Sequence, residues 1–572
     1  MYFSAVFGEV NIIEKWQKCF SRYALWLNMK EHIFKYVCAE DKYLVLGWAC
    51  NNEIDIIETN NKIFASTLGV ASQYYSPVNG TQGISIEAQL FPMQFIVVMP
   101  PFTPEHLYYS EDHGSYLFTN DLRFHIQYSG LNLSEIAVYS LLQYETIPAP
   151  LTISKNIKRL ANGCTLKLAQ KNNKLYIYWN TCFKSGKEYG DTFISNLDEL
   201  LSMAPRKSVL YYSGGVDSSL LAAHFKRMKR QDIKLINYIF SKDDKESIYA
   251  KQIATELGYE CNQVMFKISD VVQFLNNVGL EYTYPFGDAS AIPTYLLIKQ
   301  STEEYGYETV FEGTGADGLL GSALLYNRLK YFYKVPYMIR WFASQFYSRC
   351  KLYNKDMYVS FLGGKAKLSL TMPLLINYSV SIPLDGIAYK IPDQIREEIN
   401  NILIDWTENI GKGLQIEEQL TVIDLLQLCS DQMACKSFDP LRRRGVVCVY
   451  PFLYPAIVNG AFKLGWKSKY GKGMAKYILK KDLEESISRD LIYRKKSGFV
   501  PPIKLILANK KNMDLIRDCV FSPSNLILDF VSREFLDNSL RNASENKNMT
   551  WIVYRFLWSV IFASFWLAQI RY

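Results

Sequence analysis

Short apolar runs alternate with helical segments between residues 208 and 266 of this chain. The runs "SVLYYS", "KLINYIF" and "CNQVMF" have the length and the β-branched or aromatic content of buried strands. The segments between them, "SSLLAAHFKRMKR" and "ESIYAKQIATELGY", have the length of helices. This alternation predicts parallel βαβ units, because parallel neighbouring strands must be joined by a crossover. Ligands of such sheets bind at the carboxyl ends of the strands, so the residues after each strand are the first candidates for a site.

The first of these strand ends carries the sequence Ser-Gly-Gly-Val-Asp-Ser-Ser, residues 213–219. Its glycine pair would let the backbone approach an anion, and the helix that begins near Ser218 would offer unpaired N–H groups and a positive dipole end. Asp217 is unfavourable beside an anion alone. It fits a magnesium ion that accompanies phosphate groups, because this hard cation prefers carboxylate oxygens. A glycine turn with serine caps is the alternative, and the loop alone does not separate the two.

The first part of the chain has a different pattern. Segments such as "QFIVVMPPF", "HLYYSEDHGSYLFTNDLRF" and "NGCTLKLAQKNNKLYIYWN" are short, β-rich and separated by turn residues, which predicts hairpins. From Lys330 onward the chain is mostly helical and aromatic. Because 572 residues exceed what one core accommodates, we predict two domains, at residues 1–188 and 189–572.

Composition narrows the class of protein. Apolar residues make up 49% of the chain and charged residues 21%, which is typical of a folded protein with a large core. A net charge of +8 from 64 basic and 56 acidic residues gives little support for binding nucleic acid, and no nucleic-acid partner is expected. The eleven cysteines form no C-x-x-C pair, which argues against a zinc site. Reduced core cysteines and the lack of a signal-peptide pattern predict a cytoplasmic protein.

The segment "WIVYRFLWSVIFASFWLAQI", residues 551–570, is long and apolar enough to cross a membrane. Arg555 lies within it, together with two serines and Gln569. Because a guanidinium inside a bilayer is costly, the sequence favours a buried aromatic helix packed on a domain, and no membrane span is expected.

The 213–219 loop resembles the S-G-G-x-D-S signature of the PP-loop ATP pyrophosphatases. Further along, "FEGTGADGLLG" is similar to the S-G-x-G-A-D loop of the asparagine synthetase-like branch, through Gly313, Gly315, Ala316 and Asp317. The segments "YPFGDASAIPTYLL", "YPFLYPAIV", "KYILKKDL" and "YRKKSGFVPP" resemble other segments of that family in the same order. The second half of the chain is therefore identified as a member of the asparagine synthetase-like family.

The resemblance implies a fold class and a chemistry. It implies a mixed α/β protein, with a degenerate Ntn-hydrolase-like α/β/β/α domain followed by a parallel-sheet, adenine nucleotide alpha hydrolase-like domain with a helical C-terminal part. In this family a carboxylate attacks the α-phosphate of ATP, pyrophosphate leaves, and an amine displaces AMP to form an amide. ATP and Mg²⁺ are the implied cofactors. For Asp217 and Asp317 the alternative is a helix cap or a turn, and for Lys496 the alternative is a solvated surface position.

The resemblance also assigns residues to roles. Asp217 and Asp317 are the implied magnesium ligands, and Lys496 is implied to stabilise charge at the reacting centre, so these three form the expected catalytic set. The residues expected to hold the nucleotide are Ser213, Gly214, Gly215, Asp217, Ser218, Ser219, Gly315 and Lys476.

The N-terminal region resembles the glutamine amidotransferase domain of the same family through the segment "IPAPLTISKNIKRLANGCTLKL". In that family the nucleophile is a cysteine exposed after removal of the first methionine. Here Met1 is followed by Tyr2, whose phenol does not replace a thiolate, and the glutamine-binding segments are missing. We therefore expect the amine to come from free ammonia or from the substrate itself.

Other departures favour an amine on the substrate. Asparagine and β-lactam synthetases carry charged residues at the positions of Val447, Val449 and Tyr454. In addition, Gly318 stands where Glu is usual in the family, and Tyr284 stands where an acid is common. The segment "DPLRRRGVVCVYPFL" resembles instead the homologues that close lasso peptides. This resemblance implies a precursor peptide whose side-chain carboxylate is adenylated and attacked by its own amine, giving a macrolactam, with a leader peptidase as a further partner. Asp439 is a candidate acceptor for the proton of the attacking amine.

Two alternatives belong to other classes. A small-molecule amide ligase, either an ammonia-dependent asparagine synthetase or a β-lactam synthetase, would use the same adenylating residues. A non-catalytic peptide-binding scaffold would keep the fold without the chemistry, although both expected magnesium aspartates are present.

Overall fold

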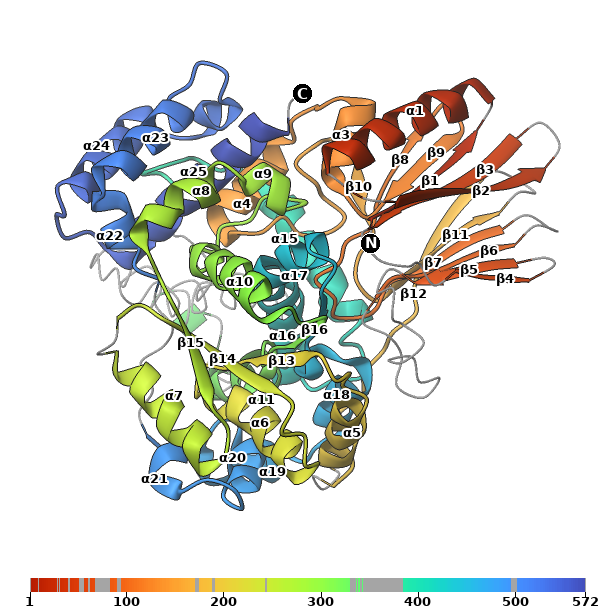
Figure 1. Ribbon diagram of the computed structural model, residues 1–572. Coiled ribbons are helices and arrows are strands. Elements are labelled where there is room, and N and C mark those ends of the chain that lie inside the picture. The colour runs from red at the N-terminus through yellow and green to blue at the C-terminus, as the bar shows by residue number, and fades with distance from the viewer. Residues whose placement is uncertain are drawn as a thin grey trace.

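The computed structural model describes most of residues 2–329, 384–494 and 501–570, and the longest interruption within these ranges covers residues 67–82. Three sheets organise the described chain (Figure 1). Two antiparallel sheets of six strands each lie face to face in the N-terminal part, and one parallel sheet of five strands lies in the C-terminal part.

The two antiparallel sheets enclose an aromatic core. The first has the order β10-β8-β9-β1-β3-β2, with strands Lys158–Arg159, Tyr108–Asp112, Ser115–Thr119, Tyr2–Gly8, Lys42–Cys50 and Glu31–Ala39. The second has the order β12-β11-β7-β6-β5-β4, with strands Lys174–Trp179, Cys164–Ala169, Gln94–Val98, Ser85–Gln89, Lys62–Ser66 and Ile56–Thr59. Phe3 and Phe118 from the first sheet meet Phe95 from the second, so inward-facing side chains alternate along the strands of both. The predicted hairpins of this region are confirmed.

Helix α1 (Val10–Trp26) covers the outer face of the first sheet. The Trp16 indole fits against the sheet because residue 47 is glycine, where a Cβ would lie 2.8 Å from the ring. The expected α/β/β/α layering is thus found as helix, sheet and sheet in the described residues. The described residues show no helix on the outer face of the second sheet, and residues 67–82 lie outside them.

Two further helices were missed in the β-rich region, α3 (Leu122–Ser129) and α4 (Glu135–Tyr144). Both begin with a side-chain cap, from Asp121 and Ser134 respectively. Their apolar residues belong to the same continuous core as the parallel-sheet part, and α4 packs on α25 (Trp551–Gln569). This segment of the N-terminal part therefore joins the core of the C-terminal part, while the core between the two antiparallel sheets stays separate.

The parallel sheet has the order β15-β14-β13-β16-β17, with strands Cys261–Met265, Lys234–Ile239, Ser208–Tyr211, Thr309–Phe311 and Val447–Val449. Its crossover helices include α6 (Val216–Arg227), α7 (Lys245–Glu256) and α10 (Ala291–Tyr305), so the predicted alternation is confirmed. The chain runs outward from β13 to β15 and then returns to place β16 on the other side of β13. The order of the strands therefore reverses between β13 and β16, and such a reversal opens a ligand crevice at the carboxyl ends of those two strands.

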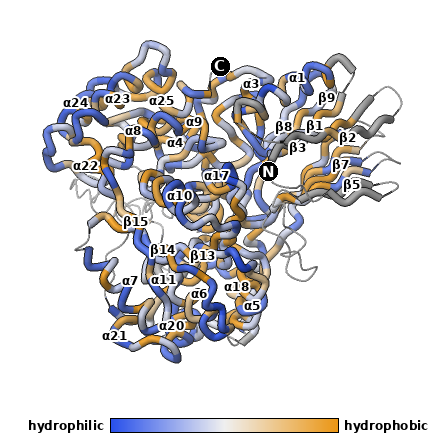
Figure 2. Tube along the Cα trace, viewed as in Figure 1, coloured by the Kyte–Doolittle hydropathy of each residue, from blue (hydrophilic) through white to orange (hydrophobic). Residues whose placement is uncertain are grey.

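The remainder of the C-terminal part is helical, as expected. Figure 2 shows hydrophilic segments on peripheral helices such as α21 and α24, and hydrophobic segments along the strands of the antiparallel sheets. The helices are α5 Asp191–Ser202, α8 Val271–Leu275, α9 Val278–Glu281, α11 Ala316–Leu329, α15 Asp393–Asn409, α16 Ile416–Ile423, η5 Asp424–Ala434, α17 Cys435–Arg443, α18 Pro455–Lys463, α19 Trp466–Tyr470, α20 Tyr477–Leu483, α21 Arg489–Ile492, α22 Ile503–Ala508, α23 Lys510–Val520, α24 Arg533–Ser544 and α25 Trp551–Gln569.

Helix α25 is the single helix of the described residues that is long and apolar enough to cross a membrane. Of its most apolar window 72% is buried inside the protein, and the Trp566 indole donates a hydrogen bond to the carbonyl of Tyr282 at 2.8 Å. Arg555 forms an ion pair with Glu145 of the C-cap of α4 at 2.6 Å. The prediction of a buried aromatic helix is confirmed, and its arginine pairs with the N-terminal part of the chain.

Candidate active site

The loop after β13 has the geometry expected of a phosphate-binding loop. Gly214 has a φ of 66°, and a Cβ there would lie 2.6 Å from the Cα of Ala250, so only glycine fits. Gly215 is the N-cap of α6 and supplies no side chain to cap it, which leaves the first N–H groups of the helix for another acceptor.

Serine hydroxyls shape this loop from within. The Ser218 hydroxyl accepts the N–H of Ser213 at 3.2 Å, and the Ser213 hydroxyl accepts the N–H of Gly215 at 3.3 Å. Ser219 lies deeper, with its hydroxyl 3.4 Å from the phenol oxygen of Tyr212. A contact between Ser219 and a nucleotide therefore stays a prediction, whereas Ser213 is exposed at the mouth of the loop.

The loop after β16 lies directly beside the loop after β13. A Cβ on Gly313 would lie 3.0 Å from the Cβ of Asp217, so glycine lets the two loops touch. Gly315 has a φ of 103° and packs on Leu453, which turns the chain into α11. Asp317 then lies in the first turn of α11 with 77% of its side chain exposed.

Lys476 joins the two predicted metal ligands. Its Nζ lies 2.6 Å from Oδ2 of Asp217 and 2.6 Å from Oδ1 of Asp317, so these two oxygens lie within twice that distance of each other. The structure therefore brings together, at the strand-order reversal, an aspartate and a lysine that are 259 residues apart in sequence. Burial lowers the pKa of the Lys476 ammonium, but the two carboxylates outweigh burial and raise its pKa above the usual value.

The donor set suits magnesium bound together with a polyphosphate. Mg²⁺ is usually held by one or two protein carboxylates plus phosphate oxygens and water, rather than by an all-protein cage. Asp217 and Asp317 supply two carboxylates from different loops, and the described residues contain no group of three or more His, Cys, Asp or Glu side chains able to hold a metal alone. The site fits a nucleotide-bound cation.

Comparison of the sequence with known proteins identifies the family of the chain. The model of the asparagine synthase family matches residues 201–568, which include both loops and Lys476. The chain belongs to the asparagine synthase family. Enzymes of this family are ATP-dependent carbon–nitrogen ligases that form AMP and pyrophosphate, and the chain is an enzyme of this class.

Individual relatives extend the similarity beyond the synthase region. The chain is 21% identical over 491 residues to asparagine synthetase [glutamine-hydrolyzing] 1 of Bacillus subtilis (strain 168), covering 80% of this chain and 73% of the relative. It is 22% identical over 459 residues to a putative asparagine synthetase [glutamine-hydrolyzing] of Mycobacterium tuberculosis (strain ATCC 25618 / H37Rv), covering 74% and 67%. A solved glutamine phosphoribosylpyrophosphate amidotransferase from B. subtilis aligns with 55% of this chain and 82% of its own at a TM-score of 0.21 and 7% identity, too weak a likeness to carry an argument.

Two polar groups at the synthase site were not assigned from the sequence. Arg494 donates to the carbonyl of Gly214 at 3.2 Å and pairs with Glu246 of α7 at 2.9 Å, so it buttresses the loop after β13. Arg494 lies in the quoted "YRKKSGFVPP" segment, whose resemblance to the family was the sequence signal for it. Lys496 of the same segment lies outside the described residues, so its catalytic role stays a prediction.

The second group surrounds the exit of β16. The carboxylate of Glu312 accepts the hydroxyls of Thr314 and Ser437 at 2.6 Å each. Next to Ser437, the Nζ of Lys436 donates to the hydroxyl of Ser290 at 2.8 Å. This polar strip runs from the loop after β16 toward the 283–290 segment, and the sequence offers no spacing signal for it.

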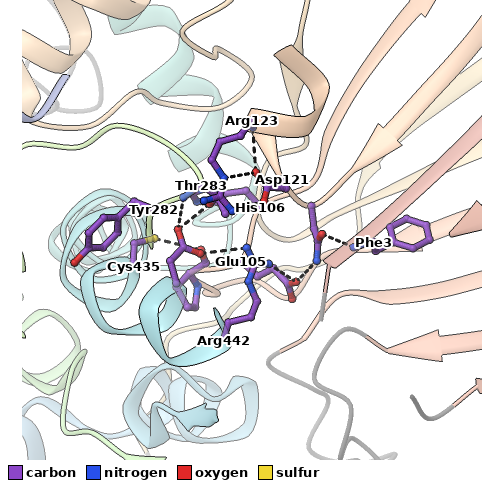
Figure 3. Close-up of polar contacts among 12 residues, drawn as sticks. Phe3, Glu105, His106, Asp121, Arg123, Tyr282, Thr283, Cys435 and Arg442 are labelled. Atoms are coloured by element: carbon purple, nitrogen blue, oxygen red, sulfur yellow. Dashed lines mark hydrogen bonds and ion pairs between the residues drawn. The ribbon is translucent and has the colours of Figure 1, made fainter. Parts of the chain in front are cut away.

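The position of the family's amidotransferase nucleophile is filled. Tyr2 is 1% exposed, and the guanidinium carbon of Arg442 lies 4.4 Å from its ring centroid. Arg442 also pairs with Glu105 at 3.4 Å (Figure 3). It pairs with Asp439 at 3.2 Å as well. An aromatic ring and a buried guanidinium thus occupy the start of β1, where the two parts of the chain meet.

Asp439 belongs to this interface. Its Oδ2 accepts both the N–H and the hydroxyl of Thr283 at 2.8 Å, in addition to the pair with Arg442. Burial raises the pKa of this carboxyl, while Arg442 opposes the rise. Because Asp439 is buried and both of its carboxylate oxygens already bind Thr283 or Arg442, the geometry does not favour it as the proton acceptor for an attacking amine.

Proposed function

We propose that this chain is an AMP-forming amide ligase that adenylates a side-chain carboxylate of a precursor peptide and closes a macrolactam with the peptide's own amine. The observation that carries the ligase part is the Asp217–Lys476–Asp317 cluster between two glycine-shaped loops at the strand-order reversal. ATP would be the co-substrate, and a precursor peptide and a leader peptidase would be the partners.

The chain's own groups account for the first half of the reaction. The uncapped N–H groups of α6 and the turn at Gly214 would bind the β- and γ-phosphates, with Arg494 holding the loop in place. Asp217 and Asp317 would hold Mg²⁺, which when bound neutralises charge on the departing pyrophosphate. Lys476 carries a fixed positive charge to the same point, and its ammonium would contact phosphate oxygens.

The source of the amine supports the peptide part of the proposal. The buried Tyr2 phenol stands at the place where the family's amidotransferase domain needs a terminal thiol, so glutamine is not the amine donor we favour. An amine on the same molecule as the acyl group reacts at a high effective concentration, which removes the need for a separate ammonia supply. The peptide identity of the substrate rests on this argument and on the "DPLRRRGVVCVYPFL" resemblance.

Residues at the strand next to β16 support a substrate unlike aspartate. Val449 lies on β17 and is 4% exposed, and Tyr454 follows it and is 2% exposed. The corresponding region of asparagine synthetases is similar in sequence but has charged residues at both positions. Buried apolar and aromatic side chains offer no counter-charge for a free amino acid.

An ammonia-dependent asparagine synthetase is the second candidate. It is favoured by the named asparagine synthetases that match most of this chain. A non-catalytic scaffold is disfavoured, because both carboxylates and the glycine loops of the synthase site are in place.

The experiment compares substrates on the purified full-length chain with ATP and MgCl₂. Pyrophosphate release is measured with L-aspartate plus ammonium, and with candidate precursor peptides taken from short reading frames next to the gene, after removal of the proposed leader. We expect release only with the peptide, together with AMP and a product lighter than the peptide by one water. Release with aspartate and ammonium, and none with the peptide, would favour the second candidate.

A further inference from the structure

The backbone of Lys476 is anchored at the centre of the site. Its backbone has a φ of 57°, its N–H donates to the carbonyl of Leu320 in α11 at 2.9 Å, and its carbonyl accepts the N–H of Lys480 at 3.0 Å. Only the side chain is left to move. Its ammonium is buried between the carboxylates of Asp217 and Asp317, 2.6 Å from an oxygen of each.

This ammonium lies in the place where a metal bridging the same two oxygens would have to bind. One ammonium and two carboxylates sum to a single negative charge, so Lys476 neutralises half of the charge of the carboxylate pair. A divalent ion between the carboxylates would repel an ammonium at this distance. The two cations therefore compete for Asp217 and Asp317.

A triphosphate changes this competition. Its oxygens offer the ammonium new acceptors beside the loop after β13, and the lysine side chain has the rotatable bonds to reach them without moving its anchored backbone. Lys480, one turn along α20 from Lys476, adds a second positive charge near the two aspartates. Burial and then the charge of Lys476 lower the pKa of Lys480, while the two aspartates oppose this.

We propose that Lys476 is an internal counter-ion that occupies the carboxylate pair until a triphosphate takes over its charge, so that a divalent metal binds only together with the nucleotide. The inference rests on the proposed function, because it assumes that this pair serves a nucleotide-bound metal. It goes further in assigning an order: the protein excludes free metal, and ATP admits it. Binding of metal before the nucleotide is thereby disfavoured.

The test measures metal binding and needs no peptide. Mn²⁺ replaces Mg²⁺, and its free concentration is followed by electron paramagnetic resonance with the full-length chain, with and without α,β-methylene-ATP. The Mn²⁺ that the analogue binds without protein is measured separately and subtracted. The wild type is expected to bind Mn²⁺ weakly alone and much more tightly with the analogue. Lys476→Met is expected to bind Mn²⁺ about tenfold more tightly than the wild type without nucleotide, because one repelling charge is gone. The gain from adding the analogue should shrink accordingly.

Two variants control this result. Lys472→Met removes a lysine with the same φ of 57° from the exposed turn before α20, and it should behave as the wild type. Lys476→Arg keeps the charge and should keep nucleotide-free binding weak. Melting curves confirm that each variant is folded, and if Lys476→Met does not fold, Lys476→Gln replaces it.

The outcomes distinguish a failure of the counter-ion proposal from a failure of the proposed nucleotide site. Equal nucleotide-free Mn²⁺ affinity of the wild type and Lys476→Met, with tight binding of both in the presence of the analogue, overturns the counter-ion proposal and leaves the nucleotide site standing. No Mn²⁺ binding by the wild type even with the analogue overturns both.

Discussion

Replacing Gly214 by alanine tests the loop after β13 most sharply. A Cβ at this position would lie 2.6 Å from the Cα and 3.1 Å from the backbone nitrogen of Ala250, so the loop or α7 has to move. The left-handed backbone itself costs an alanine about 1–2 kcal/mol. Overpacking against the backbone of α7 adds about 1–3 kcal/mol.

Gly258→Ala is the matched control for this substitution. Gly258 also has a left-handed φ, of 77°, but a Cβ there meets no atom within 4 Å. It therefore carries the conformational cost without the clash. Gly214→Ala should lower the free energy of unfolding by about 1–3 kcal/mol more than the control does.

The same strain should appear in nucleotide binding. If the loop moves to relieve the clash, its N–H groups leave the position at which they meet phosphate, and a cost of this size weakens binding about ten- to hundredfold. Titration calorimetry of α,β-methylene-ATP with MgCl₂ into both variants measures this, with melting temperatures taken without nucleotide. Equal nucleotide affinity of Gly214→Ala and Gly258→Ala would refute the assignment of this loop to phosphate binding.

Two further predictions concern stability. Arg442→Met leaves the buried Asp439 without its guanidinium partner and should destabilise the full-length chain by about 3–5 kcal/mol. Arg489→Met at the surface should not destabilise it. Equal melting temperatures of the two variants would contradict the described interface. Burial lowers the pKa of His125 to about 3, below its unfolded value near 6.5, so the unfolded chain binds an extra proton between these pH values and stability should fall as pH drops through that window. In His125→Gln the free energy of unfolding should fall less steeply, by up to about 1.4 kcal/mol per pH unit, as measured by denaturant unfolding from pH 7 to pH 4. If this slope is the same as in the wild type, the imidazole of His125 is not buried in its neutral form.

The parallel sheet was predictable from the sequence because its signals are local. The runs that became β13, β14 and β15 are apolar and short, and the segments between them have the length of helices. The glycine loops were predictable for the same reason, since each lies within a few residues of a strand end. Helix α1 was missed although its segment has helical apolar spacing, because the surrounding strands dominated the interpretation of that region.

The interface between the two parts was not predictable in this way. His106 and Arg159 bind opposite oxygens of Asp431 at 3.0 and 2.6 Å, across sequence separations of 325 and 272 residues. No periodicity or spacing links such residues, since only the folded chain brings them together. The same holds for Lys476, which resemblance assigned to phosphate but whose bridge between the two aspartates depends on where α20 packs.

The central claim is that Asp217 and Asp317 hold one nucleotide-bound cation. It is tested most directly by the Mg²⁺-dependent affinity for α,β-methylene-ATP of the wild type, Asp217→Asn, Asp317→Asn and the exposed control Asp490→Asn. We predict that each of the first two substitutions abolishes the dependence on Mg²⁺ while the control keeps it. Unchanged Mg²⁺ dependence in either Asp217→Asn or Asp317→Asn would contradict the claim.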